Sequence, residues 1–434
     1  MSDIINKKTS RRTVLKGSAI TAAGAGAATF MGPWKTNRVY AAASDKPILI
    51  GLTHDASGQF ANSGQAEKRG TIMAIEEANA KGGVLGRKIE YIWADTETTP
   101  ATGSRVAERL ITRNNVGFMV GAIQSGVANA VSQVCQKYGT VYFNTNSSSP
   151  TESGKNCHRV KFVWDGSGAN FARAAAANAV GAFGKKWLLL TNDYVWGHNT
   201  SKATRGILGE LGGSVVDEIL VPVGTRDYSS ILLKIQQAKP DVVATAVGGD
   251  DYKALRQQVQ ELKLDQHSAW LSNQLDWPDI YGAGAKAAFG VFAATWYHYL
   301  DLPGVSDFVK RYQTRWPDTR ISVPGNVTYN GYVAMRELIR AIERADSTNN
   351  IKVIKALEGH TMSAADRMQD YDAYIDPNSH HVQQTIYLCK GNDKPRDETD
   401  YFKILSKADS KAVASPNEAN CKLESYADTP TYEM

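Results

Sequence analysis

Short β-rich runs alternate with amphipathic segments through most of this chain, and the alternation limits the folds open to it. The apolar run at 47–52 predicts a buried strand, and the segment 65–80 predicts a helix. Ile72, Ile75 and Ala78 recur in that segment at a spacing of three residues and share one helical face. The pattern continues with predicted strands at 88–93, 116–120 and 141–143 and predicted helices at 104–113 and 125–137. Because short connections between such units favour parallel strands covered by helices, the alternation predicts an α/β fold.

The same alternation starts again after Asp165. The predicted helices of this second series are 169–182, 201–211, 228–237 and 251–262, and the predicted strands are 186–190, 215–221, 241–247, 269–271 and 289–293. Two long helices are also predicted at 305–316 and 328–344, and their position suggests that the chain returns to the first series. A chain of 434 residues is too long for one ordinary hydrophobic core. We therefore expect two doubly wound, Rossmann-like lobes that are joined by more than one crossover.

The first 43 residues have the features of a bacterial export signal. Arg11 and Arg12 form the pair of a twin-arginine motif. A weakly apolar Ala/Gly-rich run follows at 18–29, and the three alanines at 41–43 offer small residues for peptidase cleavage. The run is shorter than the ~20 strongly apolar residues of a membrane-spanning helix. We expect a signal peptide over 1–43 and export by the twin-arginine route to the periplasm, with a basic N-terminal tail as the alternative.

The net charge of the chain belongs mainly to this segment. The whole chain has a formal charge of +5. Seven of the 49 basic residues and one of the 44 acidic residues lie in the first 43 positions, which leaves 42 basic and 43 acidic residues. The remaining chain is therefore almost neutral, which argues against a nucleic acid or an anionic membrane as its partner.

The chain has four cysteines, at Cys135, Cys157, Cys389 and Cys421. An even number of cysteines in an exported protein favours disulfides. Proximity along the chain favours the pairs Cys135–Cys157 and Cys389–Cys421, although other pairings remain open. No CxxC or Cys/His spacing is typical of a metal site, and we expect neither a metal nor a cofactor.

Six segments carry a family pattern in their order and spacing. They are Gly51–Phe60 (GLTHDASGQF), Ala74–Gly86 (AIEEANAKGGVLG), Gly121–Gly126 (GAIQSG), Asn192–Gly197 (NDYVWG), Arg226–Ser230 (RDYSS) and Ala238–Val243 (AKPDVV). Together these segments resemble the type I periplasmic binding proteins, in particular the branched-chain amino-acid (Leu/Ile/Val) class of ABC-transporter receptors. The resemblance covers nearly the whole chain after the predicted signal peptide.

The resemblance implies a two-lobe clamp with three hinge strands. Such a clamp closes on a small ligand and presents it to an ABC permease in the inner membrane. We expect a monomer whose first lobe comprises 46–164 and 297–382 and whose second lobe comprises 165–296 and 383–434. The alternative partner is a membrane receptor, for which the same clamp would act as a ligand sensor.

Polar residues follow two neighbouring predicted strands of the first lobe. Ser125 comes after the 116–120 strand at the start of a predicted helix, where free N–H groups can bind an anion; a plain helix-capping role is the alternative. Asn146, Ser147 and Ser148 follow the next strand, where a polar surface loop is the alternative. The resemblance implies that the serines at 147 and 148 match positions whose amide and hydroxyl bind the carboxylate of the ligand. We therefore expect all four residues to contact the ligand.

The resemblance also implies ligand contacts from the second half of the chain. Trp196 stands where the family has a tyrosine that packs over the ligand, and Tyr194 lies two residues before it. Tyr329 matches a family position that faces the cleft. Gln274 stands at the usual place of the acidic residue that pairs with the ammonium of an amino acid, and Asp276 follows two residues later.

The glutamine bears on the class of ligand. An uncharged amide would leave a buried ammonium unpaired, which costs several kcal/mol, unless Asp276, Asp250 or Asp251 takes over the role. The expected ligand is a small polar solute. Branched-chain amino acid-like compounds, amides, urea-like compounds, organic or aromatic acids and small alcohol-derived metabolites all remain open.

An enzyme is the rival class, and it would use His380 and His381 near Asp376. Adjacent histidines point in different directions on a strand or a helix, which disfavours joint metal binding. The chain has no GxSxG, P-loop or HExxH pattern. We expect no enzymatic activity, and the region after Lys390 has no predicted function.

Overall fold

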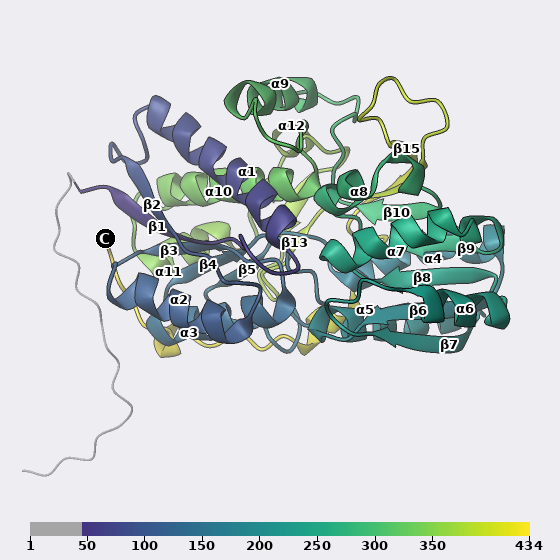
Figure 1. Cartoon of the computed structure of the whole chain (residues 1–434). Coiled ribbons are helices and arrows are strands. Elements are labelled where there is room, and N and C mark those ends of the chain that lie inside the picture. The colour runs from purple at the N-terminus through teal and green to yellow at the C-terminus, as the bar shows by residue number, and fades with distance from the viewer. Residues whose placement is uncertain (1–45) are drawn as a thin grey trace, which may run out of the picture. The chain divides into compact units, whose positions relative to one another are not determined.

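The computed structural model describes residues 46–434 (Figure 1). The predicted signal peptide and its twin-arginine motif lie outside the described residues. Among the residues that the structure describes, no helix combines the length and the apolar character needed to cross a membrane.

The first sheet is fully parallel and has the strand order β2-β1-β3-β4-β5. Its strands are β1 (Ile48–Thr53), β2 (Ile89–Trp93), β3 (Phe118–Gly121), β4 (Val141–Asn144) and β5 (Lys161–Val163). The helices beside it are α1 (Ala61–Ala80), α2 (Pro100–Thr112), α3 (Ser125–Tyr138), α10 (Asn326–Ala345) and α11 (Asn350–Leu357). Figure 1 shows α1 and α10 over one face of the sheet and α2 and α3 over the other. The sheet and these helices form the first lobe.

Two glycines let α1 and α10 pack closely. A Cβ added to Gly70 of α1 would lie 2.0 Å from the carbonyl oxygen of Thr328. A Cβ added to Gly331 of α10 would lie 2.4 Å from the carbonyl oxygen of Glu67. Because no larger residue fits at either point, the glycines fix the approach of the two helices and the positions of their first turns.

The second sheet has seven strands in the order β15-β14-β10-β9-β8-β6-β7. Its parallel strands are β6 (Lys186–Asn192), β7 (Ser214–Val221), β8 (Val242–Ala246), β9 (Ala269–Ser272) and β10 (Val291–Ala294), and its antiparallel strands are β14 (Ile386–Gly391) and β15 (Phe402–Ala408). The helices of this region are α4 (Gly168–Phe183), α5 (Val195–Glu210), α6 (Ser229–Ala238), α7 (Gly249–Glu261) and α8 (Trp277–Ala283). This sheet and its helices form the second lobe, so the predicted α/β fold with two doubly wound lobes is confirmed.

Alternate residues of β6 pack against different helices. Leu189 belongs to the apolar cluster of α4 and α5. Leu188 and Leu190 belong to the cluster that includes α6 and α7. Because side chains of a strand alternate between the two faces of a sheet, both faces of β6 are covered, as the nearly continuous apolar run requires.

Four segments of the described chain join the two lobes, and the fourth is the tail after β15. The chain passes from β5 to α4 through residues 164–167, and from β10 to α9 (Val305–Arg315) through residues 295–304. It passes a third time between β13 and β14, after a small antiparallel sheet of β11 (Thr361–Met362), β12 (Ala373–Ile375) and β13 (Val382–Gln383). A short helix, α12 (Ala364–Arg367), lies between β11 and β12. The first two segments are bonded where Thr295 Oγ1 donates to Asp165 Oδ1 at 3.2 Å.

The predicted cysteine pairing is wrong. The structure has a single disulfide among the described residues, between Cys157 and Cys421. Cys135 on α3 and Cys389 in the middle of β14 are buried thiols. Proximity along the sequence failed because β14 and β15 hold Cys389 inside the second lobe, while the chain beyond them has already left it.

The chain after β15 returns to the first lobe, in yellow in Figure 1. Glu424 accepts a hydrogen bond from the backbone N–H of Arg159, at 2.7 Å. Asn350 Nδ2 donates to the carbonyl oxygen of Pro430 at 2.8 Å, and the Tyr432 hydroxyl donates to that of Gly117. The sequence predicts a second lobe that includes 383–434, whereas residues 421–434 contact the first lobe.

Candidate ligand-binding site

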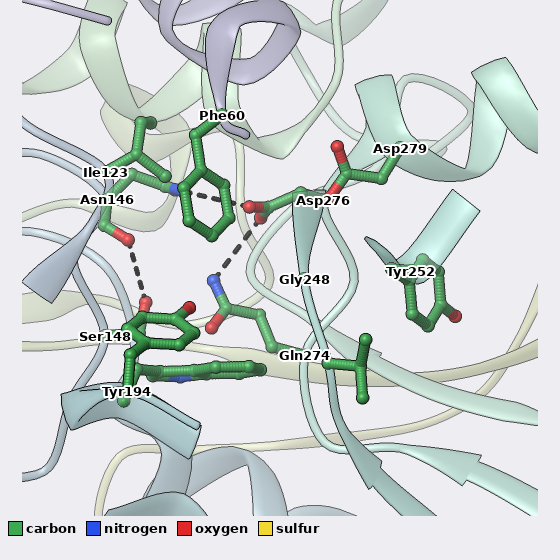
Figure 2. A pocket seen from close by; sticks show the side chains of 12 residues that line it. Phe60, Ile123, Asn146, Ser148, Tyr194, Gly248, Tyr252, Gln274, Asp276 and Asp279 are labelled. Carbon is green, nitrogen blue, oxygen red and sulfur yellow. Dashed lines mark hydrogen bonds between the residues drawn. The ribbon is translucent and has the colours of Figure 1, made fainter. Parts of the chain in front are cut away.

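A small cavity lies where loops of the two lobes meet (Figure 2). Its lining residues follow the carboxyl ends of β1, β3 and β4 on one side and of β6, β8 and β9 on the other, the usual place for ligands in parallel α/β sheets. The first wall, from the first lobe, consists of Phe60, Ile123, Asn146 and Ser148. The second wall, from the second lobe, consists of Tyr194, Trp196, Val247, Gly248, Tyr252, Gln274, Asp276 and Asp279. The centre of a water molecule can reach about 20 Å³ of this space, so the two walls are close together.

Five of the predicted site residues line the cavity: Asn146, Ser148, Tyr194, Trp196 and Gln274. The structure therefore brings together residues that are up to about 130 positions apart in the sequence, from both lobes. Asp276, which the sequence marked as a neighbour of Gln274, also lines it.

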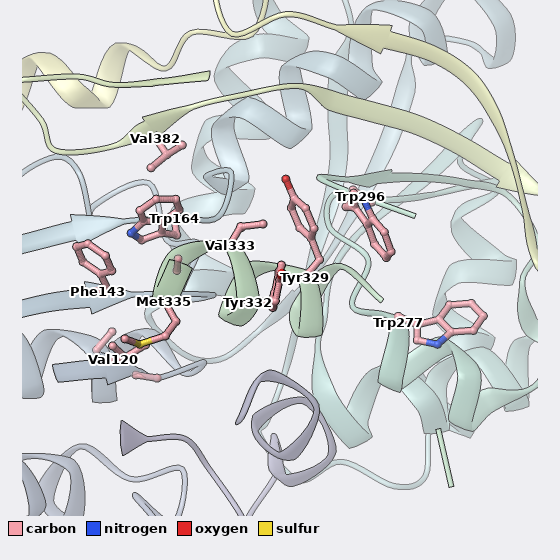
Figure 3. Close-up of a cluster of buried hydrophobic side chains, with 14 of the residues drawn as sticks. Val120, Phe143, Trp164, Trp277, Trp296, Tyr329, Tyr332, Val333, Met335 and Val382 are labelled. Atoms are coloured by element: carbon pink, nitrogen blue, oxygen red, sulfur yellow. The ribbon is translucent and has the colours of Figure 1, made fainter. Parts of the chain in front are cut away.

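Three predicted residues do not line the cavity. Ser125 and Ser147 bond to each other, with the Ser147 hydroxyl donating to Ser125 Oγ at 2.9 Å. The helix-capping role belongs to Gln124, whose side chain accepts from the N–H of Val127. Tyr329 is fully buried; its ring stacks on Trp296 at 5.1 Å, and its hydroxyl donates to a backbone carbonyl (Figure 3). These side chains are engaged within the protein.

Six lining residues were not predicted: Phe60, Ile123, Val247, Gly248, Tyr252 and Asp279. Phe60 and Ile123 lie inside the segments that carry the family resemblance, so their position after β1 and β3 was a usable signal. Asp279 lies in the first turn of α8, and no motif marks it. Its place depends on how α8 docks, which local sequence does not specify.

An aromatic row spans the cavity. The ring centroids of Phe60 and Tyr194 are 6.0 Å apart, and those of Tyr194 and Trp196 are also 6.0 Å apart. A tight turn places Trp196, because a Cβ on the next residue, Gly197, would lie 2.0 Å from the carbonyl oxygen of Asn192. Trp196 is 5% exposed, and no described residue accepts a hydrogen bond from its Nε1.

Asp276 joins the two walls (Figure 2). Its Oδ2 accepts from Asn146 Nδ2 at 3.2 Å. Its Oδ1 accepts from Asn326 Nδ2 at 3.0 Å and from Gln274 Nε2 at 3.3 Å. Burial raises the pKa of this carboxyl to about 6, although the three amide donors favour its charged form.

Asp279 has fewer donors. The Ser63 hydroxyl donates to its Oδ1 at 3.3 Å, and the backbone N–H of Gly249 donates to its Oδ2 at 2.8 Å. Gly249 has a φ of +64°, a left-handed conformation that glycine adopts without strain and that turns its N–H toward the carboxylate. Burial, and then the charge of Asp276, raise the pKa of Asp279 well above its usual range.

Asp165 lies behind the cavity on the first crossover and is fully buried. Gln274 Nε2 and the Ser148 hydroxyl both donate to its Oδ2 at 2.8 Å. Asn330 Nδ2 donates to its Oδ1 at 3.0 Å. Burial, and then repulsion from Asp276, raise its pKa to about 7. The crossover therefore presents a carboxylate that both walls bind.

The histidines considered for an enzyme have structural partners. The His380 ring stacks on Phe162 at 4.3 Å, and its Nε2 lies 2.9 Å from Glu358 Oε1. The His381 ring contacts Glu418 Oε1 at 2.6 Å and the Asp165 carbonyl at 2.8 Å. The described residues contain no group of His, Cys, Asp or Glu arranged to hold a metal ion.

Known proteins with similar sequences include Leu/Ile/Val-binding proteins and their homologues. The chain is 26% identical over 365 residues to "Leu/Ile/Val-binding protein homolog 7" of Brucella abortus, covering 80% of this chain and 89% of that protein. The alignment therefore spans most of both proteins.

Solved structures show the same fold. A periplasmic binding protein from Burkholderia mallei superposes with a TM-score of 0.79 at 22% identity, covering 87% of this chain and 99% of that one. An ABC transporter solute-binding protein from R. palustris, in complex with benzoate, superposes with a TM-score of 0.73 at 19% identity, covering 84% and 96%.

The sequence profile of the family described as "Periplasmic binding protein" matches residues 47–396, which include both sheets up to β14 and every residue that lines the cavity. The chain therefore belongs to the periplasmic binding protein family.

Proposed function

We propose that the protein is the solute-binding component of an ABC importer. It captures one small polar solute between its lobes in the periplasm and delivers it to a permease in the inner membrane. The observation that carries the proposal is the cavity itself, because its two walls come from different lobes and combine an aromatic row with buried polar groups.

Hydrogen bonds between the lobes supply a mechanism for capture. Asn146 and Asn326 from the first lobe donate to Asp276 of the second, and Ser63 donates to Asp279. Opening the cleft would expose these carboxylates to water and break the bonds. A solute that contacts both walls favours the closed state by its differential affinity for that state.

The first residues of the chain would direct export. The Arg11-Arg12 pair and the alanines before Ser44 fit a signal that is removed after transport. On this proposal the mature protein begins near Ser44 and acts as a monomer. Periplasmic fractionation, with and without an Arg11→Lys/Arg12→Lys change, tests the route.

A thermal-shift screen tests the solute-binding function. Protein comprising residues 44–434 is screened against amino acids, amines, amides and urea, organic and aromatic acids, and small alcohols. A ligand at about 100 times its Kd stabilises the native state by about 2.7 kcal/mol, which raises the unfolding temperature measurably. Mass spectrometry of the denatured protein detects any solute that co-purifies.

The expected result is a saturable shift with one chemical class, at one solute per chain. No shift with any class, together with no co-purified solute, contradicts the proposal. Uptake of the identified solute by cells that lack the protein separates import from sensing, because only an importer component changes the uptake rate.

A further inference from the structure

The charged groups of the cavity are all acidic. Asp276 and Asp279 belong to the second wall, and none of the lining residues is a lysine, an arginine or a histidine. Asp165 adds a third carboxylate directly behind Gln274 and Ser148. A ligand in this space meets negative charge and no positive charge.

The two lining carboxylates are held by neutral donors. Asp276 accepts three hydrogen bonds from amide groups, and Asp279 accepts one from a hydroxyl and one from a backbone N–H. A carboxylate has about four lone-pair sites, so both retain capacity for a further donor. Buried Arg367 interacts electrostatically with Asp165, but no ion pair joins a cation to Asp276 or Asp279 in the described part of the chain.

Ser147 and Ser148, which the family resemblance matches to carboxylate-binding positions, already form hydrogen bonds within the protein. The backbone N–H of Ser147 donates to Asn144 Oδ1 at 2.9 Å, and its hydroxyl donates to Ser125. The Ser148 hydroxyl donates to Asp165. An anionic ligand would have to displace these bonds and approach two carboxylates in a buried site, where repulsion between like charges is strong.

The aromatic row suits a cation and its carbon skeleton. Phe60, Tyr194 and Trp196 present ring surfaces around the cavity, and ring faces attract ammonium groups. The Trp196 Nε1–H, buried and without a partner among the described residues, is left to donate to one uncharged acceptor on the ligand. This orphaned donor is independent of the carboxylates and lies in the same lining.

Building on the solute-binding function above, we propose that the ligand is a small protonated amine that carries no carboxylate, with its ammonium bound by Asp276 and Asp279. Burial raises the pKa of both carboxyl groups, which have no cationic partner, and a bound ammonium would favour their charged forms. The ligand class therefore differs from amino acids and from aromatic acids, both of which carry a carboxylate.

Matched compound sets test the charge directly. Each set holds an amino acid, the amine without its carboxylate, and the acid without its ammonium: alanine, ethylamine and propionate; leucine, isopentylamine and 4-methylpentanoate; phenylalanine, phenethylamine and 3-phenylpropionate. Affinities are measured by calorimetry at pH 8 on protein comprising residues 44–434.

We expect at least one amine to bind at least tenfold tighter than both other members of its set. The inference is overturned if no amine binds, or if an acid or an amino acid binds as tightly as its amine. A response to an acid, amide or amino acid alone contradicts the charge assignment and leaves the solute-binding function standing. If no class of compound in the thermal-shift screen binds, both the amine inference and the solute-binding function are contradicted.

Two isosteric variants test whether Asp276 and Asp279 bind the ammonium group of the ligand. Asp276→Asn and Asp279→Asn should each weaken amine binding at least tenfold, because each removes a negative charge from the second wall. Asp193→Asn is the matched control, since Asp193 lies in the same lobe, is about half exposed and pairs with His198 outside the cavity. It should change affinity less than twofold.

Thermal unfolding shows whether each variant is folded. Unchanged amine affinity in both folded wall variants overturns the inference. If one variant fails to fold, the other, with the control, still decides the outcome.

Discussion

The two walls of the cavity have opposite chemistry. Across the cleft the first lobe supplies neutral donors, from Asn146, Asn326 and Ser63, and the second supplies the carboxylates that accept them, Asp276 and Asp279. Across the cavity, hydrogen-bond donors of the first lobe therefore face carboxylates of the second. When the cleft is closed, these hydrogen bonds link the two lobes. A solute either replaces some of the bonds or donates to the remaining free positions of the carboxylates.

Asp165 connects the two walls. Of the changes considered, its titration should have the largest effect on the free energy of unfolding. It accepts from Ser148 of the first wall and Gln274 of the second, and burial, followed by repulsion from Asp276, raises its pKa to about 7. A carboxyl whose pKa is raised by folding stabilises the native state below its unfolded pKa, near 4, and this contribution is lost as pH rises through 7.

Comparison of the wild type with Asp165→Asn isolates this contribution, because the other groups that titrate in this range, such as His381, are common to both proteins. The free energy of unfolding of the wild type should fall relative to that of the variant by up to about 4 kcal/mol between pH 4 and pH 8. Urea unfolding across that range measures the difference. A difference that does not vary with pH contradicts the buried-carboxylate account.

Asn146→Asp would abolish the polarity of the walls. It places a carboxylate on the first wall, opposite Asp276, where the wild-type amide donates at 3.2 Å. Like charges at this distance in a buried site favour the open state, so solute affinity should fall by about 100-fold, or about 2.7 kcal/mol. Calorimetry gives the affinity, and X-ray scattering reports the opening. Asn146→Ala, which removes the donor without adding charge, should lose less affinity.

Trp196→Ala would remove the apolar part of the second wall while leaving its carboxylates in place. We expect solute affinity to fall by about 10- to 30-fold, or about 1.4 to 2 kcal/mol, through lost contact with the ring. The fold should persist, since Trp196 sits in the first turn of α5 beside the cavity. Trp196→Phe keeps an aromatic face and is the matched control. Wild-type affinity in the alanine variant would remove Trp196 from the site.

Ser147→Ala should have the smallest effect. The hydroxyl of Ser147 bonds to Ser125, and neither residue lines the cavity. Solute affinity should therefore change less than twofold, while stability falls by about 1 kcal/mol from the lost buried hydrogen bond. Ser148→Ala, on the lining residue next to it, should weaken binding more. A larger loss of affinity at Ser147 than at Ser148 would reverse the assignment of the first wall.

The fold was largely predictable because its elements have strong local patterns. The apolar run at 47–52 became β1, and the Ile72 and Ile75 stripe became the buried face of α1. Helix α5 begins at Val195, earlier than the predicted 201. The prediction missed residues 195–200 because they have no apolar residues at helical spacing.

The disulfide and the tail were less predictable. Strands β14 and β15 were not predicted, and they bury Cys389 while the chain beyond them runs back to Cys157. Pairing by sequence proximity assumes that cysteines near in sequence stay near in space. A return of the tail to the first lobe breaks that assumption, and it depends on tertiary contacts such as the one between Asn350 and Pro430.

The location of the cavity was predictable from the sequence, whereas its lining residues were predicted only in part. Residues after β4 and β6 line the cavity as the resemblance implied, including Asn146 and Trp196. Which serine of a loop faces the cavity depends on one or two backbone torsions, so Ser147 and Ser148 could not be separated from the sequence. Asp279 depends on the docking of α8 and carried no local signal.

A crystal structure of the protein comprising residues 44–434, with the solute identified by the screen, tests the central claim most directly. The account predicts density for one solute between the two walls, in contact with Trp196 and with at least one of Asp276 and Asp279. Solute density elsewhere, or a solute that touches only one lobe, would contradict it.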